Sequence, residues 1–194
     1  MTARRAETTR KTKETDITLQ LNLDGGGVAE VATGIGFLDH LLTTLAKHAR
    51  FDLTLRCQGD LHIDDHHTAE ECALALGAAI DQALGDRAGI TRFGSAYAPL
   101  DEALARAVVD FSGRAYAYVK LGLAREALGG IACENLSHVL RSLATAARAT
   151  LHVELLRGEN DHHRVEAAFK ATALALRQAV RVTGSGVPST KGVL

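Results

Sequence analysis

The chain lacks the features that mark several broad classes of protein. Its 194 residues include no tryptophan, three tyrosines and five phenylalanines, and 22 basic residues nearly balance 23 acidic ones. A net charge of −1 provides no electrostatic footprint for nucleic acid. No segment reaches the roughly 18 consecutive apolar residues that a membrane-spanning helix needs. We therefore expect neither nucleic acid nor a membrane among its partners.

Cysteine is also scarce. The three cysteines, Cys57, Cys72 and Cys133, cannot all pair within one chain, so we expect them to be small buried hydrophobic residues. The first sixteen residues lack the apolar stretch of a secretory signal, and the acidic residues among them argue against a transit peptide. These features predict a reducing, cytoplasmic setting. The length fits one domain, which would bury about 70% of its unfolded surface.

Histidine, in contrast, is abundant and clustered. The nine histidines include the adjacent pairs His66–His67 and His162–His163. Residues 37–55 resemble residues 135–153 at an offset of 98, and residues 65–76 resemble residues 161–172 at an offset of 96. Because both matches occur in the same order, we interpret the chain as two tandem repeats, about 14–91 and 92–182, followed by a tail at 183–194.

Each repeat contains strand and helix patterns. In the first, we predict a hairpin of strands 17–23 and 28–32, a helix at about 37–49, a strand at 51–57 and a helix at about 66–84 that ends at Gly85. In the second, we predict strands 103–110 and 115–121, a helix to 148, a strand at 150–156 and a helix at about 162–182. Strand pairs that alternate with helices indicate a layered α+β fold.

The motif HHxxE, which occurs once in each repeat, predicts metal binding. On a helix, residues three and four apart share a face, so Glu70 lies over His66 and His67, and Glu166 over the second pair. Imidazole and carboxylate on one face form a metal chelate. Adjacent helical residues point about 100° apart, so one helix cannot easily offer both histidines to one ion. We expect each pair to serve two ions, completed from the other repeat or from another chain.

The equivalent histidines of the preceding helices, His40 and His138, are natural completions. Two sites of four ligands would then use His40, His66, His67, Glu70, His138, His162, His163 and Glu166. This donor set suits Mn, Fe, Zn, Ni or Co without discriminating among them. Asp64, Asp65 and Asp161 flank the pairs and are candidates to hydrogen-bond the second ring nitrogens.

A phosphate group is the second ligand that the sequence suggests. The tail Pro188-Ser189-Thr190-Lys191-Gly192 combines hydroxyls, a lysine and a glycine that could cradle a phosphate, although it is not a P-loop. Arg92 and Arg114 lie in turns and are candidate bidentate phosphate clamps.

Five segments together resemble the imidazoleglycerol-phosphate dehydratase family. They are GIGFLDHLL, HIDDHHTAEE, APLDEALARAVVDFSGR, ENDHHRVEAAFKA and SGVPSTKGVL, and the likeness extends from about Glu14 to Leu194. The resemblance implies metal-dependent dehydration of D-erythro-imidazole glycerol phosphate to imidazole acetol phosphate in L-histidine biosynthesis. It also implies an internally duplicated α+β fold, with helices layered between two mostly antiparallel four-stranded sheets. It further implies a homo-oligomeric cage of 24 subunits, with two Mn²⁺ ions per active site at subunit boundaries.

The resemblance also implies residue roles. It divides the ligands into one site of His40, His67, Glu70 and His163 and another of His66, His138, His162 and Glu166. Substrate-binding residues would be Glu14, His40, His66, His67, Glu70, Arg92, Arg114, His162, His163, Lys170, Ser189, Thr190 and Lys191. Two would be catalytic: Glu166 would move the proton, and Glu14 would aid departure of the hydroxyl.

Two other functions use similar ligands. A dinuclear metal hydrolase also employs histidine and glutamate, but the sequence offers no clear aspartate to bridge two ions. A metal-storing or structural cage would bind ions without turnover. An assay of dehydration with and without Mn²⁺ separates the three.

Overall fold

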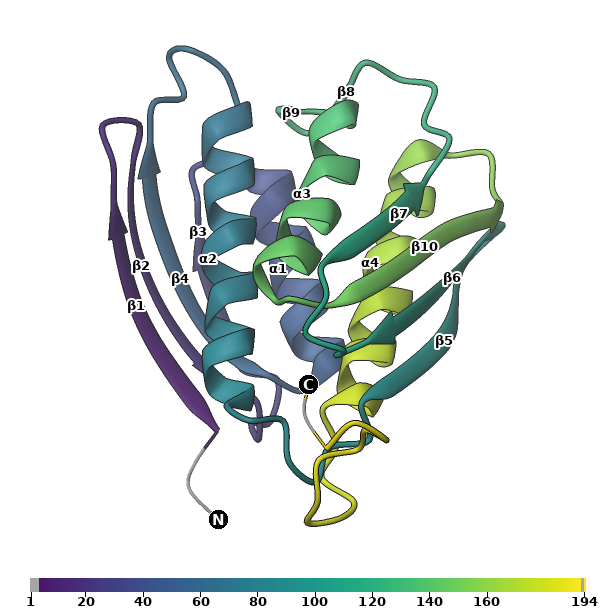
Figure 1. The fold of residues 1–194 in the computed structure, drawn as a ribbon. Coiled ribbons are helices and arrows are strands. Elements are labelled where there is room, and N and C mark those ends of the chain that lie inside the picture. Colours follow the sequence, from purple (N-terminus) through teal and green to yellow (C-terminus); the bar gives the residue numbers. More distant parts are fainter. Residues whose placement is uncertain (1–3, 193) are drawn as a thin grey trace.

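The computed structural model describes residues 4–192 and 194, and within them two four-stranded sheets enclose four helices (Figure 1). The strands of the sheets are β1 (Arg5–Lys11), β2 (Thr15–Asn22), β3 (Ala29–Ala32), β4 (Asp52–Gly59), β5 (Phe93–Leu100), β6 (Ala103–Asp110), β7 (Tyr116–Lys120) and β10 (Thr150–Arg157). The helices are α1 (Gly36–Ala49), α2 (His66–Leu84), α3 (Cys133–Ala146) and α4 (Asp161–Ala179), and β8 (Ala127–Leu128) with β9 (Ile131–Ala132) forms a small ribbon.

The two sheets have the same topology. Their strand orders are β1-β2-β4-β3 and β5-β6-β10-β7, and in each sheet the last pair is parallel while the others are antiparallel. This arrangement confirms the α+β fold and is consistent with an internal duplication. Strand β1 precedes the predicted start of the first repeat at residue 14 and is the counterpart of β5. Residues 1–3 and 193, which the predicted domain and tail include, lie outside the described residues.

The predicted hairpin of 17–23 with 28–32 is wrong. Strand β2 pairs with β1 and β4, whereas β3 runs parallel to β4 at the sheet edge. The side chain of Asp52, at the start of β4, explains the path: its Oδ1 accepts hydrogen bonds from the backbone N–H groups of Gly26, Gly27 and Val28 at 2.8, 3.1 and 3.0 Å. These hydrogen bonds hold residues 26–28 beside the start of β4, so that the following strand, β3, pairs with β4 and not with β2.

Helices from different repeats pack together in the middle layer. α2 contacts α3, and α1 contacts α4, while α2 covers the first sheet and α4 the second. α2 and α3 approach closely at Gly77, where a Cβ would lie 2.4 Å from the carbonyl oxygen of Leu143. The core between the layers includes Phe51, Phe111 and Phe169, all fully buried. Cys72 and Cys133 are buried as predicted, and Cys57 is half-buried.

The helix predictions are largely confirmed. α2 spans the predicted 66–84, and the N–H of Gly85 caps it by donating to the carbonyl oxygens of Asp81 and Gln82. α4 ends at Ala179, three residues before the predicted end, because Val180 forms its C-cap. Within the described part of the chain, none of the helices combines the length and apolar character that crossing a membrane requires.

Candidate metal centre

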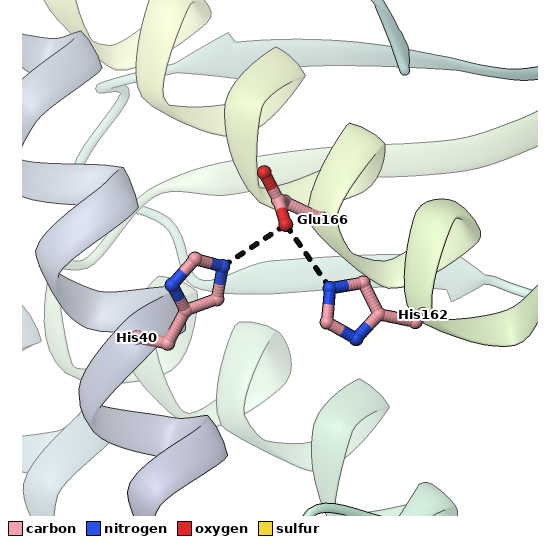
Figure 2. Close-up of side chains that lie close together, drawn as sticks. All are labelled: His40, His162 and Glu166. Carbon is pink, nitrogen blue, oxygen red and sulfur yellow. Dashed lines mark hydrogen bonds and ion pairs between the residues drawn. The ribbon is translucent and has the colours of Figure 1, made fainter. Parts of the chain in front are cut away.

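The first cluster of metal-binding side chains joins α1 and α4. His40 projects from α1, and His162 and Glu166 project from successive turns of α4 (Figure 2). Glu166 Oε2 lies 2.9 Å from His40 Nε2 and 3.3 Å from His162 Nε2. We call these three residues the Glu166 group. An open cleft of about 530 Å³ lies beside them, lined also by Phe37 and Arg125.

The second cluster joins α2 and α3 in the same way. His66 and Glu70 lie one turn apart on α2, and His138 lies on α3 with its Nε2 2.9 Å from Glu70 Oε1. The rings of His66 and His138 stack at 5.0 Å. We call these three residues the Glu70 group. In each group one ligand atom per residue lies within 4.8 Å of the others, a spacing that could hold one metal ion.

The clusters within one chain differ from the division of ligands that the resemblance implied, which stays a prediction for the assembled sites. His40 shares a cluster with Glu166 and His162 instead of Glu70, and His138 meets Glu70 and His66 instead of Glu166. The reason is helix packing, because α1 lies against α4 and α3 against α2. Adjacent histidines point to different partners, as helical geometry predicts: His66 Nδ1 lies 2.8 Å from Asn135 Oδ1, whereas His67 Nδ1 lies 3.0 Å from Asp60 Oδ2.

The other histidine of each pair faces a sheet end. His67 Nδ1 lies 3.0 Å from Asp60 Oδ2, at the end of β4, and its Nε2 lies 3.8 Å from Glu14 Oε1. Asp60 can reach α2 because Gly59 packs on Thr68, where a Cβ would lie 2.0 Å from Thr68 Oγ1. Hydrogen bonding to Asp60 raises the pKa of His67.

His163 has a matching environment in the second repeat. Its Nδ1 lies 2.7 Å from Glu102 Oε2, and its Nε2 lies 3.8 Å from Asp101 Oδ2, both in the β5–β6 turn. Backbone hydrogen bonds from Asn160, together with the bond from His163, lower the pKa of Glu102 to about 2. His67 and His163 thus have an oriented ring whose Nε2 points away from its own cluster.

The prediction that Asp64, Asp65 and Asp161 bond the ring nitrogens is wrong. Asp64 accepts from the backbone N–H of His66, and Asp161 accepts from the backbone N–H groups of Ala124 and Arg125. Asp65 accepts a hydrogen bond from Asn135 Nδ2, and Asn135, not Asp65, contacts the ring of His66.

The partners that the sequence analysis missed are Asp60, Glu102 and Asn135. Asp60 and Glu102 lie seven and sixty-one residues from the histidines they contact, and Asn135 lies sixty-nine residues from His66. These contacts depend on which strand end meets which helix. The HHxxE pattern therefore carries no signal for them.

Glu166 is the most strongly perturbed ligand. Partial burial acts to raise its pKa, but hydrogen bonds from Lys170 and His40 prevail and lower the pKa to about 2. The Lys170 ammonium lies 2.6 Å from Glu166 Oε1. Six imidazoles and two carboxylates without a thiolate fit a divalent first-row ion, and the carboxylate is already ionised near neutral pH.

Comparison with known proteins decides the family. A family model described as imidazoleglycerol-phosphate dehydratase matches residues 33–176. The chain belongs to this family. The imidazoleglycerol-phosphate dehydratase of Candida glabrata is 56% identical to it over 95% of the chain and 97% of that protein. The dehydratase of Phytophthora nicotianae is 61% identical over 98% of the chain, but the chain spans only 42% of that relative's length.

Solved dehydratase structures share the fold. The crystal structure of the Staphylococcus aureus dehydratase matches with a TM-score of 0.84 and 34% identity, covering 92% of this chain and 99% of that one. The Pyrococcus furiosus dehydratase, crystallised in complex with (S)-C348, matches with a TM-score of 0.83 and 40% identity, covering 96% and 100%. The resemblance found in the sequence is thereby confirmed at the level of family and fold.

The dehydratase fold places the predicted phosphate-binding residues far from the metal ligands of the same chain. The N–H of Arg92 donates to the carbonyl oxygen of Ala179, at the end of α4, and its guanidinium binds Asp110 and the carbonyl oxygen of Pro188 in the tail. The ligands that α4 carries, His162, His163 and Glu166, lie at its other end. The seventeen helical steps from His162 to Ala179 span about 25 Å.

The remaining predicted phosphate ligands lie between β6 and β7 and in the tail, which meet where a Cβ on Gly113 would lie 2.9 Å from the carbonyl carbon of Leu194. The carbonyl oxygen of Arg114 accepts from Thr150 at the start of β10, and Ser189, Thr190 and Lys191 form a turn in which Ser189 Oγ accepts from the N–H of Lys191.

Proposed function

We propose that this chain catalyses the metal-dependent dehydration of D-erythro-imidazole glycerol phosphate to imidazole acetol phosphate in L-histidine biosynthesis. Family membership supports a dehydratase, which is a lyase of histidine biosynthesis. The observation that carries the metal dependence is the pair of three-residue clusters, one built on each HHxxE motif.

The metal would be Mn²⁺, two ions per active site. The Glu70 group and the Glu166 group would each supply three ligands, and His67 and His163 would supply the fourth. When bound, divalent ions would stabilise negative charge on the imidazole ring and hold the ring in place. The donor set of imidazoles and carboxylates without a thiolate supports a divalent first-row ion, and the carboxylates Glu70 and Glu166 are the donors that suit Mn²⁺.

Two glutamates are proposed to serve the reaction. Dehydration breaks one C–H and one C–O bond, releases water and leaves an enol that becomes the ketone. Glu166 is proposed to move the proton, since it is ionised and lies between His40, His162 and Lys170. Glu14, in the β1–β2 turn, is proposed to aid departure of the hydroxyl, because its half-exposed carboxylate faces His67 Nε2.

The geometry favours active sites shared between subunits. A substrate with one ring and a three-carbon chain cannot reach from the metal ligands at the start of α4 to Arg92, whose backbone bonds the far end of that helix about 25 Å away. Arg92 also binds the tail that holds Ser189, Thr190 and Lys191. The phosphate-binding residues would therefore act with the metal ligands of another chain, whereas Lys170 lies beside Glu166 of its own chain. This arrangement supports a homo-oligomer, which we propose to be the 24-subunit cage of the family, in the cytoplasm.

The decisive experiment measures product formation from imidazole glycerol phosphate by metal-stripped protein, before and after addition of Mn²⁺. We expect product only with the ion, and we expect Glu166→Gln to lose most of the turnover while it still binds Mn²⁺ elsewhere. Near-full turnover of Glu166→Gln would exclude its role as the base. Release of inorganic phosphate would indicate a hydrolase, and bound Mn²⁺ without any turnover would indicate storage.

A further inference from the structure

The two metal-binding groups have equivalent ligands but different surroundings. Aligning the repeats places Asn135 of α3 opposite Phe37 of α1, and Lys170 of α4 opposite Leu74 of α2. Asn135 and Lys170 each touch a ligand of their own group. The ligand types alone therefore do not predict equal affinity for a cation.

Asn135 orients one ligand of the Glu70 group. Its Oδ1 lies 2.8 Å from His66 Nδ1, and its Nδ2 donates to Asp65 Oδ2 at 3.0 Å. Asp65 also accepts from the backbone N–H of Ala132 at 2.7 Å, so the amide is fixed with its oxygen toward His66. A neutral His66 must then donate from Nδ1, and the lone pair on Nε2 remains for a metal ion.

The Glu166 group lacks this arrangement. Phe37 lies against His162 with ring centroids 4.9 Å apart and offers no hydrogen-bond acceptor. Among the described residues, no side chain accepts a hydrogen bond from His162 Nδ1. The tautomer and the rotation of this ring are therefore held less firmly, and its side chain is 47% exposed.

The carboxylates differ as well. Lys170 lies 2.6 Å from Glu166 Oε1, so an arriving dication must approach a carboxylate that already binds an ammonium. Glu70 has the partly buried Leu74 at the equivalent position. Arg10 of β1 interacts with Glu70 through its charge, but its guanidinium pairs with Glu71 through two nitrogens.

We propose that the two groups bind divalent cations with unequal affinity and in order. The Glu70 group binds first and tightly, with Asn135 as its positioning residue. The Glu166 group binds second and exchanges its ion more readily, because of Phe37 and Lys170. This inference rests on the proposed metal dependence of the enzyme. Loss of a hydrogen bond that orients a metal-bound histidine costs about 10- to 100-fold in affinity, so the two affinities should differ by at least about tenfold.

The test is a titration of the metal-stripped oligomer with Mn²⁺, in which electron paramagnetic resonance measures the free ion. We expect two classes of one ion per chain, with Glu70→Gln removing the tight class and Glu166→Gln the weak one. Asn135→Leu should weaken the tight class tenfold or more, and Lys170→Met should tighten the weak class severalfold. Lys120→Met, which removes an exposed lysine of β7, is the matched control and should change neither class.

Lys170→Met keeps the proposal falsifiable if the buried Asn135 does not tolerate replacement. The inference is refuted if both ions bind with one affinity, or if Lys170→Met leaves the affinity of the weak class unchanged. Metal-dependent dehydration would stand in either case. Dehydration by protein that binds no Mn²⁺ at all would instead refute the proposed function, and the inference with it.

Discussion

Replacing Gly77 by alanine tests whether the close crossing of α2 and α3 holds the Glu70 group together. An alanine Cβ at this position would lie 2.4 Å from the carbonyl oxygen of Leu143, 2.8 Å from Ala146 Cβ and 2.9 Å from the backbone nitrogen of Ala147. Ordinary contact begins near 3.4 Å. α3 must therefore retreat by roughly 1 Å at the crossing.

The magnitude follows from two opposing effects. Helix propensity favours alanine over glycine by about 1 kcal/mol. Overpacking costs about 1 to 3 kcal/mol, and the upper value applies here because two of the three atoms in the way belong to the backbone and cannot rotate aside. We expect Gly77→Ala to lower the free energy of unfolding by about 2 kcal/mol, although an alanine in an open helix would raise it.

Chemical unfolding at fixed protein concentration measures this change. Gly184→Ala is the control, because nothing lies within 4 Å of a Cβ at that position. Separation of α2 from α3 should also weaken Mn²⁺ binding by the Glu70 group and leave the Glu166 group, on α1 and α4, unaffected. If Gly77→Ala unfolds with the same free energy as the parent, α2 and α3 can move apart without loss of stability, and the reasoning is refuted.

Three further changes test other parts of the structure. Glu102→Gln should lower Mn²⁺ affinity about tenfold or more in a titration, since the amide no longer holds His163 as a carboxylate does. Arg92→Leu should raise KM for the phosphate substrate far more than it lowers kcat, because it releases Asp110 and the tail; a change in kcat alone would contradict this. Hydrogen bonds from Val28 and Gly26 lower the pKa of Asp52 below its ordinary 3.8, so its ionised form stabilises the fold above that pH. This contribution is lost as pH falls below about 4, and Asp52→Asn should flatten the decline of unfolding free energy in acid.

Local patterns predicted the helices well and the strand pairing poorly. Helix α2 could be read from its sequence because the apolar positions, the HHxxE motif and Gly85 all lie within one segment. The partner of β2 could not be read in this way. β1 has one buried residue, Ala6, among seven, so its sequence does not alternate, and it was missed as a strand. Without β1, residues 28–32 were the nearest strand available for pairing with β2.

The ligands show the same limit at a finer scale. The spacing of His66 and Glu70 on one helix predicts that they share a face, and the structure agrees. The choice between Glu70 and Glu166 as the partner of His40 depends on which helices cross, and residues 126 apart carry no local signal of that contact. Asn135 and Phe37 differ in the same non-local way, because each acts on a histidine of another helix.

The helical geometry that separates adjacent histidines connects metal binding to assembly. Each HHxxE motif places one histidine in its own three-residue group and directs the other toward the end of a sheet, beside Glu14 or Asp101. A fourth ligand for either group must therefore come from a histidine that points away from it. If the phosphate ligands also belong to another chain, a single subunit holds every residue type that the reaction needs but no complete site. Any change that separates the subunits should then abolish turnover while the three-residue groups stay intact.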